Sequence, residues 1–96
     1  MQLTVRGKNV EVTAALKDYV AKKVGKIERY FDLPVTAQVT LSVQRDRHIV
    51  EVTLPLDGGF LVRGEEATGD MYASIDLVVE KLARQLEKYK ARLNRH

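Results

Sequence analysis

The chain has no cysteine and only two histidines among its 96 residues. Disulfides and thiolate chemistry are therefore excluded, and apolar burial alone must stabilise the fold. His48 and His96 are too far apart for a helical metal-binding pair, and no pattern of Asp or Glu places either in a catalytic triad. We therefore expect no enzyme, no catalytic residue, no metal site, no cofactor and no small-molecule substrate.

Long apolar runs are also missing. The longest are only a few residues, far short of the roughly 20 that span a bilayer, so we expect no membrane contact. The residues after Met1 have no signal-peptide pattern, which makes the cytoplasm the expected compartment. With 45% apolar and 30% charged residues, the composition predicts one folded domain over residues 1–96 and argues against disorder.

Two periodicities divide the chain into elements. Alternation of apolar and polar residues predicts strands over 3–6, 37–44, 50–54 and 60–63. Apolar residues at three- and four-residue spacing predict helices over 13–32 and 69–94. Thr13 is a candidate N-cap of the first helix, and Thr68 or Asp70 of the second. The pair Gly58 and Gly59 supplies the positive φ angles of a hairpin turn between the last two strands.

The order of elements is β-α-β-β-β-α. A strand-helix-strand start predicts a parallel pair with a right-handed crossover, and the two later hairpins are antiparallel. Each helix has one apolar stripe and each strand one apolar face. We therefore expect an α+β fold, a two-layer sandwich with both helices on one face of a four-stranded mixed sheet. The second helix, roughly 37 Å long at 1.5 Å per residue, should overhang the sheet.

The net charge of +3 is unevenly distributed over the helices. At 100° per residue, basic side chains of the first helix lie opposite its apolar stripe, with Lys23 at the flank, and those of the second helix form one stripe beside the apolar one. They are Lys22, Lys23, Lys26 and Arg29 on the first helix, and Lys81, Arg84, Lys88 and Arg92 on the second. Two adjacent basic stripes predict one positive strip suited to RNA phosphates. A solvated helix surface is the alternative interpretation.

Acidic residues are separated from these basic ones. Asp76, Glu80 and Glu87 fall on the other side of the second helix. Glu65, Glu66 and Asp70 form a small acidic cluster, which we interpret as charge that complements the N-terminal dipole of that helix.

The open face of the sheet should carry no aromatic side chain. Its expected residues are Thr4, Arg6, Gln38, Thr40, Ser42, Gln44, Glu51, Thr53 and Arg63. Sheet-based RNA readers stack bases on aromatic rings of that face. We therefore expect any RNA binding to use the helices and loops, mostly through phosphates.

Several separated motifs resemble the bacterial ribosome hibernation-promoting factors and ribosome-associated inhibitors over the whole chain. The most specific is Asp70-Met71-Tyr72-Ala73-Ser74-Ile75-Asp76-Leu77, continuing into Glu80-Lys81-Leu82-Ala83-Arg84-Gln85-Leu86-Glu87-Lys88. Gly7, Asn9-Val10-Glu11-Val12-Thr13 and Tyr30-Phe31-Asp32 fit the same pattern. The motifs agree with the family in order and spacing.

The resemblance implies a layout related to double-stranded RNA-binding domains. It also implies binding to the small ribosomal subunit and its 16S-type ribosomal RNA, in the channel shared by messenger RNA and tRNA anticodon ends. Occupancy there would block initiation and preserve idle ribosomes in stationary phase or stress. The family's RNA contacts map onto the eight basic residues given above, and the domain itself is expected to be monomeric.

Two questions stay open at this point. Short members of the family end about where this chain ends, whereas long members continue into a dimerisation domain. Residues 50–56 and 93–95 look more like the long type. The alternatives to ribosome binding are a free-standing double-stranded RNA binder and a protein–protein module, in which the overhanging turns with Tyr89 and Leu93 would dock a partner.

Overall fold

The structure is a computed structural model that describes residues 1–32 and 34–93, with the side chains described as far as residue 90. The elements are β1 (Gln2–Lys8), α1 (Ala14–Gly25), the 3-10 turn η1 (Lys26–Tyr30), β2 (Thr36–Gln44), β3 (Arg47–Pro55), the 3-10 turn η2 (Asp57–Gly59), β4 (Leu61–Thr68) and α2 (Met71–Leu93). The predicted β-α-β-β-β-α order is confirmed.

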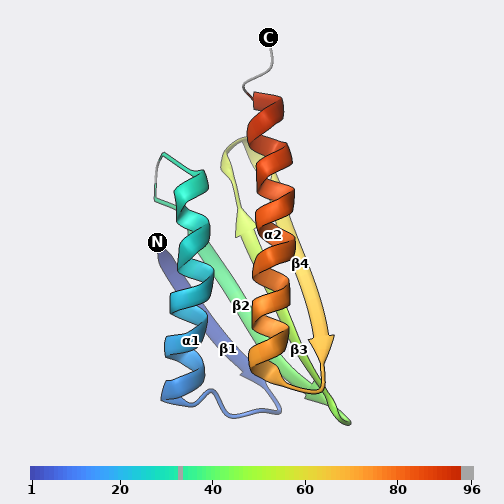
Figure 1. The fold of residues 1–96 in the computed structure, drawn as a ribbon. Helices are drawn as coiled ribbons and strands as arrows, with labels where there is room; N and C mark the ends of the chain where they lie inside the picture. Colours follow the sequence, from blue (N-terminus) through green and yellow to red (C-terminus); the bar gives the residue numbers. More distant parts are fainter. Residues whose placement is uncertain (33, 94–96) are drawn as a thin grey trace.

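The four strands form one mixed sheet in the order β1-β2-β3-β4. β1 is parallel to β2, and the β2–β3 and β3–β4 pairs are antiparallel. Both helices cover the same face of this sheet, side by side, as Figure 1 shows. The predicted two-layer α+β sandwich is therefore confirmed.

The core lies between the helix layer and the covered face of the sheet. The strands contribute the alternating residues predicted from the sequence, such as Val39, Val50 and Val52, all at most 1% exposed. The helices contribute their apolar stripes, including Val20 and Leu82, which are fully buried. Burial of each such side chain is worth about 1.5–3 kcal/mol, which accounts for a stable fold without disulfides.

The first helix begins as predicted and ends earlier. Leu16 N donates to Thr13 Oγ1 over 3.2 Å, so Thr13 is the N-cap. The α-helix stops at Gly25, and residues 26–30 continue as a 3-10 turn. Glycine costs about 1 kcal/mol in a helix interior, which favours a change of helix type at that position. Ile27 remains buried, so the apolar stripe continues into η1.

β4 is longer than the sequence indicated. It runs to Thr68 and places Glu65 opposite Glu51, and Glu66 opposite Val50. The alternation was hidden because the buried position before Glu65 is Gly64, where α2 packs closely against the strand. The interpretation of Glu65 and Glu66 as partners of the α2 dipole is therefore wrong, since both belong to the sheet.

α2 begins after Asp70, whose Oδ1 accepts from Tyr72 N over 3.4 Å. Its last turns extend past the end of the sheet, as expected (Figure 1). There the ring of Tyr89 meets Phe60 of the β3–β4 connection at a centroid distance of 6.4 Å. Among the described residues, no helix has the length and apolar character needed to cross a bilayer.

Candidate nucleic-acid interface

The outer surface of the helix layer carries exposed basic side chains on both helices. On the α1 side these are Lys22, Lys26 and Arg29, which we call the α1 row. On α2 they are Arg84 and Lys88, which we call the α2 row. All five are exposed, so five of the eight predicted residues are available to an anionic partner.

An acidic side of α2 lies between these two rows. Asp76 accepts from the hydroxyl of Tyr19 on α1 over 2.6 Å. Glu87 accepts from the hydroxyl of Tyr30 on η1 over 3.2 Å. Because these contacts turn the acidic side of α2 toward α1, the basic residues form two rows with carboxylates between them. The helical wheels predicted one continuous basic strip, and the structure has two separate rows instead.

Lys23 lies inside this contact between helices. Its Nζ is 3.5 Å from Asp76 Oδ1, and its side chain is only 29% exposed. The ammonium also lies 5.5 Å from the centre of the Tyr19 ring, a cation–π distance. Tyr19 packs edge-on against Tyr72 at 4.9 Å between centroids. Lys23 is thus engaged in joining α1 to α2, unlike its neighbours Lys22 and Lys26.

Arg29 is positioned by the aromatic ring that follows it. Its Nη2 donates to the Tyr30 hydroxyl over 3.1 Å, and its guanidinium lies 5.1 Å from the Tyr30 ring centre. The hydrogen bond to Tyr30 raises the pKa of Arg29 above its ordinary value, with a smaller contribution from Glu87. The arginine therefore stays charged and exposed at the end of the α1 row.

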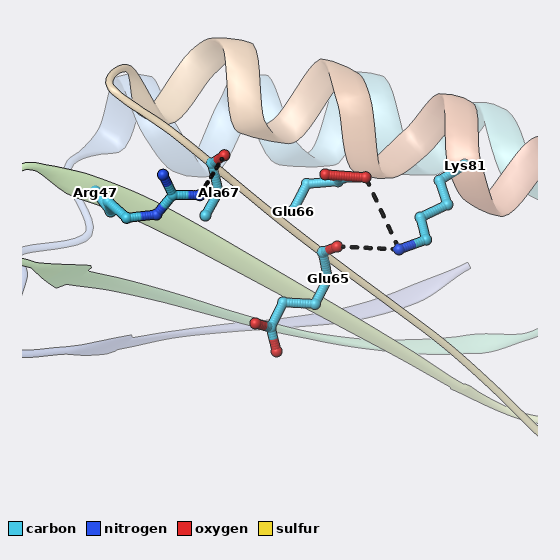
Figure 2. A network of polar contacts seen from close by, with 5 residues as sticks. All are labelled: Arg47, Glu65, Glu66, Ala67 and Lys81. Carbon is cyan, nitrogen blue, oxygen red and sulfur yellow. Dashed lines mark hydrogen bonds and ion pairs between the residues drawn. The ribbon is translucent and has the colours of Figure 1, made fainter.

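Lys81 points to the opposite side of α2, toward β4. Its Nζ donates to the backbone oxygen of Glu65 over 3.3 Å and lies 3.8 Å from the Glu66 carboxylate. Figure 2 shows this network together with Arg47, whose Nη2 donates to the oxygen of Ala67 over 3.2 Å. Lys81 thus belongs to the contact between α2 and the sheet. Arg92 lies in α2, but its side chain falls outside what the structure describes.

Two tyrosines join α1 and η1 to α2. Tyr19 and Tyr30 are both half-buried and pack against the core. Their hydroxyl partners Asp76 and Glu87 each lie 57 positions away along the chain. No pattern in the sequence signals such a pairing. Only the spacing of both tyrosines beside the apolar stripe of α1 could have hinted at a contact between helices.

The open face of the sheet agrees with its prediction. The four strands carry no Phe, Tyr or Trp. A shallow depression on this face is lined by Thr4, Arg6, Gln38 and Thr40 together with Val39. Thr53 is only 8% exposed and accepts a long 3.5 Å hydrogen bond from Arg63 Nε. The face offers no ring on which a base could stack.

Comparison with known proteins gives matches over nearly the whole of this chain. A family described as sigma 54 modulation protein / S30EA ribosomal protein matches residues 3–94. The chain is 49% identical to the ribosome hibernation promotion factor of Lactococcus lactis, over 99% of this chain and 52% of that protein. It is 44% identical to the ribosome hibernation promoting factor of Escherichia coli, with 100% of both chains covered.

Solved structures give the same fold. The N-terminal domain of Thermus thermophilus Protein Y has a TM-score of 0.85 and 39% identity, and covers 93% of this chain and 99% of that one. A ribosomal subunit interface protein from Coxiella burnetii has a TM-score of 0.83 and 27% identity. The match covers 95% of this chain and 99% of that one.

The chain spans about half the length of its relatives from Lactococcus lactis and Bacillus subtilis, 52% and 51%, and all of the one from Escherichia coli. The family match covers nearly every residue, and the relatives include ribosome hibernation promoting factors. The chain therefore belongs to the family of sigma 54 modulation proteins and S30EA ribosomal proteins.

Proposed function

We propose that this chain is a ribosome hibernation factor that binds the small ribosomal subunit through its 16S-type ribosomal RNA. It occupies the channel used by messenger RNA and tRNA anticodon ends, and so blocks initiation on idle ribosomes in stationary phase or stress. The role is steric and electrostatic and involves no chemical reaction. It would be carried out in the cytoplasm, where ribosomes are.

The observation that carries the proposal is the pair of exposed basic rows on the outer surface of the helix layer. Lysine and arginine side chains that neutralise phosphates release counterions, which drives binding to RNA of any sequence. Phosphate contacts position a protein without specifying bases. Selectivity for the ribosome would then come from the fit of the two-layer domain in the channel. The names of the relatives support this choice of RNA.

The separation of the rows suggests how the RNA is contacted. Packed helices lie about 8–10 Å apart, and Asp76 and Glu87 occupy the space between the rows. A single phosphate backbone that crossed both helices would meet these carboxylates. We therefore infer that the α1 row and the α2 row contact two separate backbone segments, as the walls of a channel provide. Lys23 and Lys81 act in positioning, because each is engaged with an acidic partner.

Co-sedimentation with purified ribosomal subunits tests the proposal. The chain should pellet with small subunits and not with large ones, and a messenger RNA with a strong initiation site should reduce the bound fraction. Binding to both subunits alike, or binding that messenger RNA leaves unchanged, would contradict occupancy of the channel. A plain RNA duplex serves as competitor for the alternative of a free-standing double-stranded RNA binder. Equal affinity for the duplex and the small subunit would favour that alternative.

A further inference from the structure

A cavity of about 430 Å³ opens at the end of the molecule where α2 passes the sheet. It lies between η1, the residues that follow it, the end of β3 and the last turns of α2. Its apolar lining includes Tyr30, Phe31, Pro34, Pro55, Leu56 and Tyr89. The volume falls within the range of about 300–1,000 Å³ typical of binding pockets.

The rim of this cavity continues into exposed apolar side chains. Phe60 is 61% exposed and Leu61 is 56% exposed, the two most exposed of the large apolar residues in the part of the chain that the structure describes. Phe60 touches the cavity wall through Tyr89, and Leu61 pairs with Pro55 across β3 and β4. Neighbouring exposed apolar groups of this kind mark interaction sites.

The local backbone holds Phe60 in this exposed position. Gly58 and Gly59 have φ angles of 77° and 80°, which other residues rarely adopt, and they reverse the chain directly before Phe60. Leu56 N donates to the oxygen of Phe60 over 2.8 Å and closes the turn. The backbone of Phe60 is therefore held close to Tyr89, which lines the cavity.

The charge of the cavity indicates the chemistry of its occupant. Asp32 and Asp57 line it, and Lys90 is the one cation among the lining residues that the structure describes. Among the described lining residues, carboxylates thus outnumber cations two to one. RNA phosphates would be repelled by the two carboxylates, whereas lysine or arginine side chains would be attracted. Charge complementarity thus favours a basic polypeptide.

We propose that this cavity binds a short extended segment of a partner protein. The segment inserts one aromatic or large aliphatic side chain between the rings of Tyr30 and Tyr89, and flanking basic side chains pair with Asp32 and Asp57. The site is separate from the two basic rows, so the domain would contact RNA with its helix layer and a basic protein segment with this end.

Titration of the ¹⁵N-labelled chain with defined probes, followed by amide chemical shifts, tests this proposal without ribosomes. The first probe is a blocked pentapeptide with a central phenylalanine and two lysines on each side. The second replaces the lysines with glutamates, and the third is guanosine monophosphate. We expect the basic peptide to shift the amides of Leu56, Asp57 and Tyr89 and to bind about tenfold more tightly than the acidic one.

Charge-reversal variants make the test specific. Asp57→Lys should lower the affinity for the basic peptide by about tenfold. Asp46→Lys, in the exposed turn at the other end of the sheet, should leave that affinity unchanged. The amide spectrum of each variant shows that it is folded. Phe60→Ser, at an exposed position, should also weaken binding. No shift at millimolar peptide, equal binding of both peptides, or shifts at the cavity from the nucleotide alone would each overturn the proposal.

Discussion

The ammonium group of Lys23 on α1 lies 3.5 Å from Oδ1 of Asp76 on α2. The same carboxylate accepts the hydroxyl of Tyr19 over 2.6 Å. One acidic residue therefore ties two side chains of α1 to α2 in the middle of the helix layer. This relationship separates Lys23, which joins helices, from Lys22 and Lys26, which face solvent.

Lys23 and Lys22 should differ in what their loss affects. Lys23→Ala removes the ion pair and should lower the free energy of unfolding by about 0.2–1 kcal/mol, the range for partly exposed pairs. Lys22→Ala should leave stability unchanged and weaken binding to the small subunit. Urea unfolding and co-sedimentation of both variants provide the comparison. Equal effects of the two substitutions in both assays would contradict the different roles of Lys23 in joining the helices and Lys22 in binding.

Tyr19 should make the fold sensitive to alkaline pH. The hydrogen bond to Asp76 raises the pKa of Tyr19 above its ordinary value. A group whose pKa is raised on folding stabilises the native state fully below its unfolded pKa, about 10 for tyrosine. That stabilisation is lost as pH rises through the folded-state value. Above about pH 10, the free energy of unfolding should fall more steeply for the wild type than for Tyr19→Phe.

Urea unfolding at a series of alkaline pH values and constant ionic strength measures this difference. Tyr72→Phe is the matched control, because Tyr72 packs against Tyr19 and its hydroxyl makes no hydrogen bond within the described residues. If Tyr19→Phe and the wild type lose stability in parallel, the Tyr19–Asp76 hydrogen bond does not make the fold sensitive to alkaline pH.

Gly64 has little room for a side chain. A Cβ added there would lie 3.1 Å from Leu82 Cδ2 and 3.3 Å from Leu82 Cγ, tighter than most Cβ contacts in proteins, so the Leu82 side chain would have to shift. Gly64→Ala should therefore cost about 1–3 kcal/mol, as overpacked cores do. Gly25→Ala is the contrasting change, because nothing lies within 4 Å of its added Cβ and its φ of −57° is helical.

We expect Gly25→Ala to raise stability by about 0.4–1 kcal/mol, by restricting the unfolded chain. Thermal unfolding of the two variants gives opposite shifts of Tm if α2 packs on β4 as described. A Gly64→Ala variant as stable as the wild type would show that the contact between Gly64 and Leu82 is looser than the structure has it.

The salt dependence of ribosome binding should distinguish Arg84 from Lys81. The slope of log K against log[salt] is negative, and each phosphate contact that is lost reduces its magnitude by about 0.7–0.9. Arg84→Gln should produce a change of this size, because Arg84 is exposed. Lys81→Gln should produce a smaller one, because Lys81 is held by Glu65 and Glu66. Affinities measured at several salt concentrations for both variants provide the comparison, and the reverse order would be inconsistent with it.

Local patterns were sufficient to predict the fold. Alternation in β2 and β3, helical spacing in α1 and α2, and the cap at Thr13 depend on neighbours within a few residues, so the sequence displays them directly. β4 was predicted too short because Gly64 replaces an apolar residue at the point where α2 approaches. A local pattern therefore fails to predict a strand where packing against another element determines the residue type.

The candidate interface was predictable only in part. A helical wheel assigns each residue an angle, and it placed Lys22 and Lys26 opposite the apolar stripe of α1 and Arg84 and Lys88 beside the apolar stripe of α2. A helical wheel cannot predict which side chains of other elements lie next to each residue. The partners Asp76 of Lys23 and Glu66 of Lys81 come from other elements, so the division of the basic residues into exposed and engaged ones required the structure.

The α1 row and the α2 row are both expected to bind ribosomal RNA. The most direct test is co-sedimentation with small subunits of two charge-reversed variants, Lys22→Glu with Lys26→Glu, and Arg84→Glu with Lys88→Glu. The control is Lys8→Glu with Lys17→Glu, which has the same change in net charge at exposed positions outside the rows. We predict that each row variant loses at least about tenfold in affinity and that the control retains most of its binding. Equal losses in all three variants, or retained binding in both row variants, would contradict this expectation.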